Sequence, residues 1–235
     1  MKLLHTIFII TLLAGCGTVG TQIRGNGNIK TSHRDIGNAK GIQITGSFNT
    51  EIVRGEPGIS ITGDENLQDY MITELKDDQL YVHLKYRTVF FNSKALTVRI
   101  SMPDINEIKL DGSGTVSGDN EFITTNRFTV MVKGTGMVDL AVRSSVLEAD
   151  LDGSGRINIK GETNSLMSRI DGSGELNTVT TLCKNADITI VGSGKARILV
   201  SNSLIANISG SGTVYYKGKP SVTKNITKSG RVIEN

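Results

Sequence analysis

The sequence predicts an all-β protein, chiefly a right-handed parallel β-helix, and three observations lead to this prediction. The tripeptide Gly-Ser-Gly, or a close variant, recurs every 18–22 residues along the second half of the chain. Apolar residues alternate with period two between these tripeptides, as they do in strands. No intervening segment has the length and periodicity of a helix. A chain that returns on itself at this period stacks coil upon coil, and parallel connections are almost always right-handed.

The first fifteen residues have the pattern of an export signal. Met1 and Lys2 precede an apolar run from Leu3 to Leu13, which is too short for a helix that must cross a bilayer core with about 20 residues. The tetrad Leu13-Ala14-Gly15-Cys16 follows this run. We therefore expect residues 1–15 to be removed as a signal peptide.

The same tetrad resembles the bacterial lipobox. This resemblance implies that Cys16 becomes the mature N-terminus and carries diacylglycerol and an acyl chain, which together anchor a protein stably to a membrane. Gly17, in place of an aspartate, implies an outer-membrane lipoprotein that faces either the periplasm or the cell surface. Residues 16–24 would then form a tether. The alternative is an ordinary signal peptide with an incidental cysteine.

Cysteine content and charge narrow the function further. With Cys16 lipidated, Cys183 has no partner for an intrachain disulfide, and we expect it to be a buried, unreactive thiol. The formal charge of +3 falls to +2 once Lys2 is removed, with 25 basic against 23 acidic residues. Basic residues are scattered and are not interleaved with aromatic ones, so the sequence predicts no nucleic-acid partner.

Residues 25–110 carry alternating apolar sets with less regular spacing. Alternating isoleucines precede Gly46-Ser47-Phe48, where phenylalanine replaces the second glycine. Asp64 to Leu75 is expected to be a short helix or an irregular loop, and Tyr86 to Lys94 contains turn residues around an apolar Val89-Phe90-Phe91 tip. We expect this irregular β portion to continue into the repeats and to cover one end of the solenoid, which would otherwise expose unpaired backbone and core.

Residues 111–235 form the regular repeats. Glycine at their turns supplies backbone conformations with positive φ that other residues reach only with strain. Each turn also carries one hydroxyl at the same place, and the seven residues are Ser113, Thr135, Ser154, Ser173, Ser193, Ser211 and Ser229. These hydroxyls are predicted to form a structural ladder along one edge, bonded to neighbouring backbone and to each other. A catalytic nucleophile would not need so many copies.

Several short motifs, taken in order, resemble a known family. The lipobox is followed by Arg24-Gly25-Asn26-Gly27-Asn28, Gly63-Asp64-Glu65-Asn66-Leu67, a strand closing on Met102-Pro103-Asp104 and the serial Gly-Ser-Gly turns. This combination resembles the putative auto-transporter adhesin, head GIN domain family over nearly the whole mature chain. The resemblance implies a β-helix-like fold of bacterial envelope proteins, a role proposed in adhesion and no established catalytic residues. The chain departs from the pattern at Phe48 and Lys228, where glycine is expected.

Candidate catalytic and metal-binding residues are few. Aspartate precedes the turn glycine at three positions, Asp111, Asp152 and Asp171. A lysine interrupts this column and the residues that continue it are neutral, so we expect turn-forming aspartates and no bound metal or other cofactor. The mature chain has no tryptophan, and its histidines, His33 and His83, lie at neither nucleophile nor metal-ligand spacing. The sequence therefore predicts no catalytic residues and a protein that is not an enzyme.

The remaining hypothesis is a binding surface. Solenoids present long, fairly flat faces to extended partners or to one another, so we expect a non-catalytic envelope lipoprotein that acts as an adhesin or surface-binding module. Exposed apolar groups often mark interfaces, and the predicted partner contacts are Phe90, Phe91 and Tyr215, although packing over a solenoid end would explain them equally well.

The expected partners follow from this hypothesis. They are the membrane, through the N-terminal lipid, and an unidentified protein or glycan of the envelope or the extracellular space, with self-association left open. A glycan-active β-helix enzyme and a periplasmic scaffold or sensor component are the alternative functions.

Overall fold

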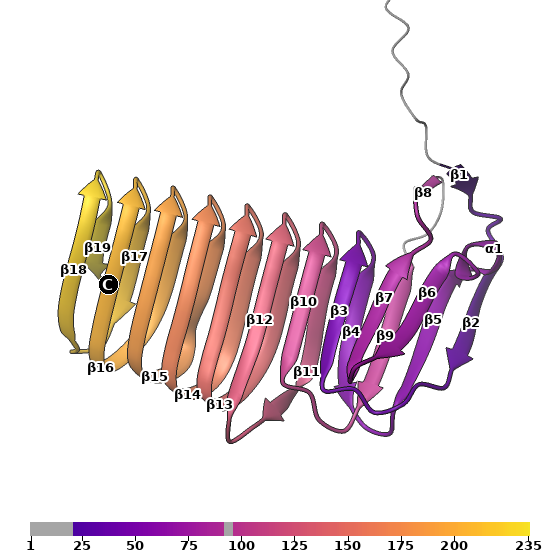
Figure 1. Cartoon of the computed structure of the whole chain (residues 1–235), viewed down its shortest axis with the longest axis horizontal. Coiled ribbons are helices and arrows are strands. Elements are labelled where there is room, and N and C mark those ends of the chain that lie inside the picture. Colours follow the sequence, from indigo (N-terminus) through magenta and orange to yellow (C-terminus); the bar gives the residue numbers. More distant parts are fainter. Residues whose placement is uncertain (1–20, 92–95) are drawn as a thin grey trace, which may run out of the picture.

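The computed structural model describes residues 21–91 and 96–235. The predicted signal peptide, Cys16 and the first part of the predicted tether lie outside these residues. The described chain is nearly all strand, with one short helix, α1 (Glu65–Gln68). Its strands form a long row of stacked coils that ends in a group of antiparallel strands near the N-terminus (Figure 1). The predicted all-β parallel solenoid is confirmed.

Each coil contributes to two parallel ladders, which we call face A, on the entering side of each turn, and face B, on the leaving side. In order along the solenoid, face A comprises β7 (Gln79–Leu84), β3 (Gly41–Gly46), β10 (Glu107–Gly112), β12 (Arg127–Gly134), the second halves of β13 (Met137–Gly153), β14 (Arg156–Gly172), β15 (Glu175–Gly192) and β16 (Lys195–Gly210), and then β18 (Ser221–Lys228). Face B comprises β9 (Thr97–Met102), β4 (Asn49–Arg54), β11 (Thr115–Ile123), the first halves of β13 to β16, β17 (Thr213–Lys217) and β19 (Arg231–Glu234).

The hydrophobic core lies between the two faces. Side chains along each strand alternate between buried and outward positions, and on β13 the inward residues Val138, Leu140 and Leu151 are at most 2% exposed. Inward residues on successive coils are paired in register, as in the face A column Leu151, Ile170, Ile190 and Ile208. Burying each such side chain contributes roughly 1.5–3 kcal/mol, so these columns are what holds the coils in register.

The glycine turns stack on one another along one edge of the solenoid. Gly153 has a φ of +123°, and an added Cβ there would lie 2.4 Å from the carbonyl oxygen of Gly134 on the preceding coil. That oxygen accepts a hydrogen bond from the amide of Ser154 at 2.9 Å, so close approach of the two backbones is what joins the turns. Glycine is therefore required both for its φ and for its missing side chain.

The two turns that lack an expected glycine lie at the two ends of this ladder. Phe48 closes the first turn, between β3 and β4. On the adjoining coil no glycine turn joins β7 to β9, because the chain leaves the solenoid between these two strands. Phe48 is buried there, at 5% exposure. Lys228 opens the last turn with a φ of +72°, close to the left-handed α region that other residues tolerate, whereas the glycines at this position have φ between +101° and +143°.

The coils are not stacked in the order of the sequence. The coil of β3 and β4 pairs on one side with β10 and β11 and on the other side with β7 and β9. The β7–β9 coil thus lies on the capped side of the β3–β4 coil, and the chain then crosses to the other side of the β3–β4 coil to continue with β10 (Figure 1). The regular stack includes β3 and β4, which lie in the portion that the sequence indicated to be irregular.

The irregular N-terminal portion covers one end of the solenoid, and it does so with antiparallel strands, which the sequence did not indicate. β5 (Gly58–Asp64) pairs with β9, β2 (Ile29–Arg34) pairs with β5, and β6 (Met71–Lys76) pairs with β7. The segment expected to be a short helix or loop contains both α1, which buries Leu67, and most of β6. The sequence did not indicate that strand, because its apolar residues Met71, Ile72 and Leu75 do not alternate with period two.

The C-terminal coil ends the solenoid in a different way. Lys224 on β18 occupies the register position of buried Ala206 on β16, and its ammonium donates a hydrogen bond to the carbonyl of Val232 at 3.5 Å. An inward-facing charge at the edge of a sheet opposes the addition of another strand.

Candidate binding surfaces

An apolar tip stands at the N-terminal end of the solenoid, on the side of the glycine turns (Figure 1). Its frame is a separate two-stranded parallel sheet of β1 (Thr21–Arg24) and β8 (Thr88–Phe91). We call residues 85–91, together with β1, the β8 tip. Tyr86, Val89 and Phe91 are exposed on it, at 84%, 54% and 43%. Exposed apolar side chains that gather in one place often mark an interaction site.

The two predicted phenylalanine contacts have opposite environments. Phe90 is half-buried, packs against the core and makes an edge-to-face contact with Tyr70, with ring centroids 6.4 Å apart. Phe91 points outward and is open to a partner. The sequence did not indicate that Tyr86 and Val89 are exposed, although period-two alternation along β8 was a signal that could have separated outward Val89 and Phe91 from Phe90.

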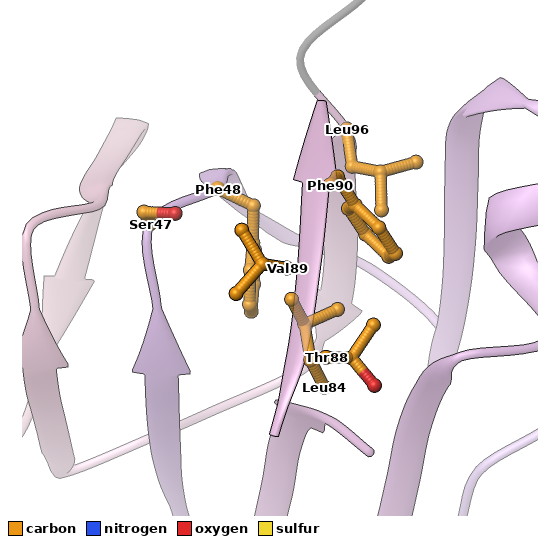
Figure 2. Close-up of a pocket in the computed structure, with 7 residues that line it drawn as sticks. All are labelled: Ser47, Phe48, Leu84, Thr88, Val89, Phe90 and Leu96. Atoms are coloured by element: carbon orange, nitrogen blue, oxygen red, sulfur yellow. The ribbon is translucent and has the colours of Figure 1, made fainter. Parts of the chain in front are cut away.

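A hollow of about 290 Å³ lies under the β8 tip (Figure 2). Its lining residues are Ser47, Phe48, Leu84, Thr88, Val89, Phe90 and Leu96. Phe48 from the first turn and Val89 from β8 both face this space, so the phenylalanine that replaces a turn glycine also forms part of its wall. The hollow is largely apolar and contains no titratable side chain among its described lining residues.

A row of charged and aromatic side chains crosses four coils of face B and includes the third predicted contact, Tyr215. Glu175 on β15 forms ion pairs with Arg156 on β14, at 3.2 Å, and with Arg197 on β16. The Arg197 guanidinium lies 5.3 Å from the ring centroid of Tyr215 on β17, as in a cation–π contact. We call Arg156, Glu175, Arg197 and Tyr215 the face B row. A half-buried aromatic ring can stack on a sugar ring, and the guanidinium groups beside it can bind an anionic group.

Arg169 on β14 contacts two aspartates of face A, one on its own strand through its side chain and one on the preceding coil through its backbone amide. Asp152 and Asp171 are paired in register on adjacent coils, and the guanidinium of Arg169 donates to both oxygens of Asp171, at 2.8 and 3.0 Å. Asp150 accepts a hydrogen bond from the Arg169 amide at 2.8 Å. Burial raises the pKa of Asp150, with Glu148 and Asp171 adding to the effect. Within residues 21–91 and 96–235, no three acidic, histidine or cysteine side chains gather in a way that could hold a metal ion.

The predicted hydroxyl ladder lies on an exposed edge, but its hydroxyls do not join the coils. The seven side chains are exposed, and no hydrogen bond among the described residues links one of these hydroxyls to another. The backbone makes the contact instead, since the amides of Ser154, Ser173, Ser193 and Ser211 each donate to the glycine carbonyl one coil behind at 2.9 Å. The ladder is therefore a ladder of peptide groups, and a small polar side chain suits it because the position faces water.

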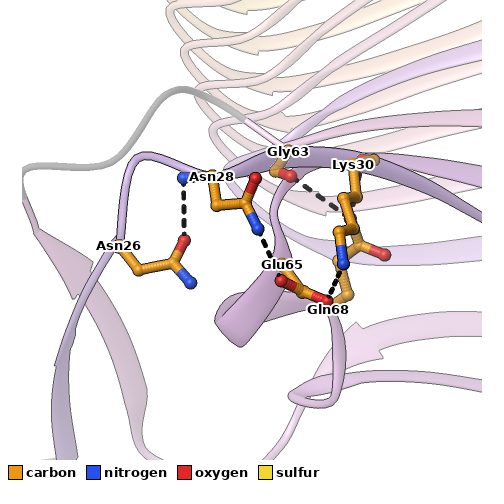
Figure 3. A network of polar contacts seen from close by, with 6 residues as sticks. All are labelled: Asn26, Asn28, Lys30, Gly63, Glu65 and Gln68. Atoms are coloured by element: carbon orange, nitrogen blue, oxygen red, sulfur yellow. Dashed lines mark hydrogen bonds and ion pairs between the residues drawn. The ribbon is translucent and has the colours of Figure 1, made fainter.

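The motifs near the N-terminus meet in a polar network at the capped end (Figure 3). Glu65 accepts a hydrogen bond from the side-chain amide of Asn28 at 2.7 Å and pairs with the ammonium of Lys30. The hydrogen bond from Lys30 lowers the pKa of Glu65, with burial opposing it and Asn28 assisting. Gln68 donates to the carbonyls of Lys30 and Gly63 at 2.7 and 3.2 Å. These contacts fasten the segment after β1 to α1, which is a structural role.

The one close serine–histidine pair identified in the described chain lies on the antiparallel cap. Ser60 Oγ is 3.0 Å from His33 Nδ1, and both side chains lie on the solvent side of the β2–β5 pair. A serine nucleophile needs a histidine oriented by a third group. Among the described residues no acidic side chain is hydrogen-bonded to His33. The second histidine, His83, contacts the carbonyl of Leu84 at 3.0 Å.

Cys183 is buried, as expected, and its Sγ lies 2.9 Å from the carbonyl oxygen of Asn185. Burial raises its pKa from 9.0 to about 11. A thiolate is the reactive form, so in a Cys16→Ala background the native protein should react with a thiol reagent roughly 100-fold more slowly than the unfolded protein at neutral pH. Equal rates would show that the thiol is accessible. The raised pKa also means that stability is lost as the pH rises from about 9 towards 11, because only the unfolded thiol then ionises.

Comparison with known proteins extends this description. The sequence profile of a family described as "Putative auto-transporter adhesin, head GIN domain" matches residues 38–220. A putative lipid binding protein from Parabacteroides distasonis has a similar crystal structure, with a TM-score of 0.77, 26% identity and coverage of 92% of this chain and 100% of the other. A putative adhesin from Bacteroides fragilis is also similar, with a TM-score of 0.84, 22% identity and coverage of 91% and 99%. No curated protein matches significantly. None of the helices in the described residues has the length and apolarity needed to span a membrane.

Proposed function

Because the chain belongs to the putative auto-transporter adhesin, head GIN domain family, we propose that it is a non-catalytic adhesin, a binding module displayed by the bacterial cell envelope. The family and its solenoid fold favour a cell-surface or envelope protein. We further propose that the chain is a lipoprotein, that it is anchored in the outer membrane through Cys16, and that it binds an envelope or extracellular protein or glycan.

The face B row is the observation that carries the binding function. Its four side chains are fixed by ion pairs and a cation–π contact between rigid, stacked strands, so they are already arranged before a partner arrives. Preorganised aromatic and arginine side chains are the groups that most often dominate binding energy. Successive coils lie about 4.8 Å apart, so the row spans roughly 14 Å and suits an extended partner.

Binding through this row predicts a specific mutational effect. Tyr215→Ala should weaken binding to a glycan or envelope-protein array by about tenfold or more, because it removes the aromatic surface beside Arg197. Tyr81→Ala is the matched control, since Tyr81 is also a half-buried, outward tyrosine but lies on face A. Unchanged binding by the Tyr215 variant, or an equal loss in the Tyr81 variant, would contradict the assignment of the row.

The lipoprotein proposal has its own test. Cys16→Ala should abolish incorporation of labelled lipid and move the protein out of the outer-membrane fraction, because no acyl chain would be attached. Protease treatment of intact cells then separates display on the surface from a periplasmic location. A variant that still fractionates with the outer membrane would contradict anchoring through Cys16.

The two alternatives make different predictions. A glycan-active enzyme should release products from envelope or dietary glycans, and the activity should be lost in Ser60→Ala if the Ser60–His33 pair were catalytic. A periplasmic scaffold or sensor component should bind an envelope protein and be resistant to external protease. The non-catalytic adhesin reading predicts no product release and cleavage by external protease.

A further inference from the structure

We propose that the β8 tip is a second membrane contact, which seats the N-terminal end of the solenoid on an anionic lipid surface beside the lipid anchor. The inference rests on the proposed anchoring through Cys16. It assigns the exposed apolar groups of the tip to the bilayer and leaves the face B row for the partner.

The exposed side chains of the tip have the chemistry of the membrane interface. Tyr86 combines an apolar ring with a polar hydroxyl and is 84% exposed, which suits the boundary between headgroups and acyl chains. Val89 and Phe91, two residues apart on β8, project on the same side of their strand and are 54% and 43% exposed. Phe90, between them, holds the strand to the core, so the two outward side chains are presented on a fixed support.

The charge of the tip is complementary to anionic lipid. Neither of the two segments that form it, β1 and residues 85–91, contains aspartate or glutamate. Arg24, Lys85 and Arg87 supply positive charge around the exposed rings, and the Arg87 guanidinium lies 5.2 Å from the ring centroid of Tyr86. Aromatic side chains flanked by basic ones bind the surface of anionic membranes through burial of the rings and attraction to the headgroups.

The position of β1 brings the anchor to the same place. β1 begins at Thr21, five residues after Cys16, and pairs with β8 so that Gln22 lies opposite Val89 and Arg24 opposite Phe91. Five residues span at most roughly 18 Å when fully extended, so the acyl chains on Cys16 must enter the bilayer close to the tip. A lipid anchor and a polar–aromatic surface then act as two signals at one point, and two signals hold a protein at a membrane better than one.

This seat also orients the molecule. The coil of β17, which carries Tyr215, is six coils from the coil of β4 along face B, or roughly 29 Å at 4.8 Å per coil. The C-terminal coils lie at the opposite end of the row of stacked coils from the tip (Figure 1). The face B row would therefore be held clear of the headgroups.

The absence of tryptophan from the sequence allows a direct test. The lipidated protein is reconstituted in vesicles of phosphatidylethanolamine and phosphatidylglycerol, as Tyr86→Trp and, in a matched variant, as Tyr215→Trp. Brominated acyl chains quench indole emission by contact. We expect emission from the Tyr86→Trp variant to shift to the blue and to be quenched, whereas emission from the Tyr215→Trp variant changes in neither respect. Val89→Trp replaces Tyr86→Trp if the latter does not fold.

Each remaining outcome has a defined meaning. Vesicle-bound protein with unquenched Tyr86→Trp and Val89→Trp variants would overturn the membrane seat while leaving the lipid anchor intact. Equal quenching of the Tyr215→Trp variant would also overturn it, because the solenoid would then lie along the surface. Protein that fails to float with the vesicles would overturn the proposed lipid anchoring itself. Replacing Lys85 and Arg87 by glutamate should reduce quenching in anionic vesicles and not in vesicles of phosphatidylcholine alone.

Discussion

Gly172→Ala is expected to destabilise the protein by about 3 kcal/mol or more. Gly172 has a φ of +115°, which an alanine adopts only with strain, and an added Cβ would lie 2.5 Å from the carbonyl oxygen and 3.2 Å from the carbonyl carbon of Gly153. Both neighbours are backbone atoms of the preceding coil, so they can move only by separating the two turns. Unfolding in guanidinium chloride, followed by far-ultraviolet circular dichroism, measures the change.

The neighbouring serine provides the control. Ser173→Ala should change the free energy of unfolding by less than about 0.5 kcal/mol, because its side chain is exposed and the contact to Gly153 is made by its amide, which alanine retains. A Gly172→Ala protein as stable as the Ser173→Ala protein would refute the claim that bare backbone contact joins the coils. A large loss in the Ser173 variant would restore a structural role for the hydroxyl column.

Phe128→Ala is expected to cost about 3–5 kcal/mol, the range for truncation of a fully buried aromatic residue. Phe128 lies on β12 with 0% exposure, and its ring centroid is 6.1 Å from that of Phe122, which is 1% exposed. The rigid strands on both faces limit how far the core can collapse into the space that the ring leaves, so most of the cavity should persist. The same denaturant titration measures the loss.

Met131 is the matched control on the same strand. It is three residues further along β12, points outward and is 38% exposed. Met131→Ala should lower the free energy of unfolding by less than about 1 kcal/mol, because the Met131 side chain buries little apolar surface on folding. If the two variants lost equal stability, the inward and outward assignment along β12 would be wrong. A Phe128 loss below about 1 kcal/mol would show that the coils repack around the missing ring.

The turn glycines explain why the architecture could be predicted from the sequence. Glycine at the Gly153 position is enforced by local φ and by the carbonyl of Gly134, and the same demand returns on each coil. The alternation of Val138, Leu140 and Leu151 follows from the pleat of a strand with one face in the core. Both constraints recur at short range, so they leave a periodic record in the sequence.

The coils that pack against the β3–β4 coil could not be predicted from these local patterns. Gly46-Ser47-Phe48 indicates a turn, but the pairing of β3 with both β7 and β10 joins strands that lie far apart in the chain and stack out of sequence order. Turn residues predict that a coil exists, but they do not predict which other coil packs against it. The same holds for the cap, where antiparallel β2, β5 and β6 are selected by the exposed end that they cover.

The candidate surfaces divide in the same way. The sequence predicted Phe90, Phe91 and Tyr215 as partner contacts. Only the folded chain shows that Phe90 packs inward, that Tyr86 and Val89 are exposed, and that Arg197 lies over the Tyr215 ring. By itself, the sequence determined a parallel solenoid of glycine-cornered coils, because each corner must satisfy the same local geometry. Tertiary structure alone decided the stacking order, the cap and the composition of the tip and the face B row, because those depend on contacts between segments that no local pattern relates.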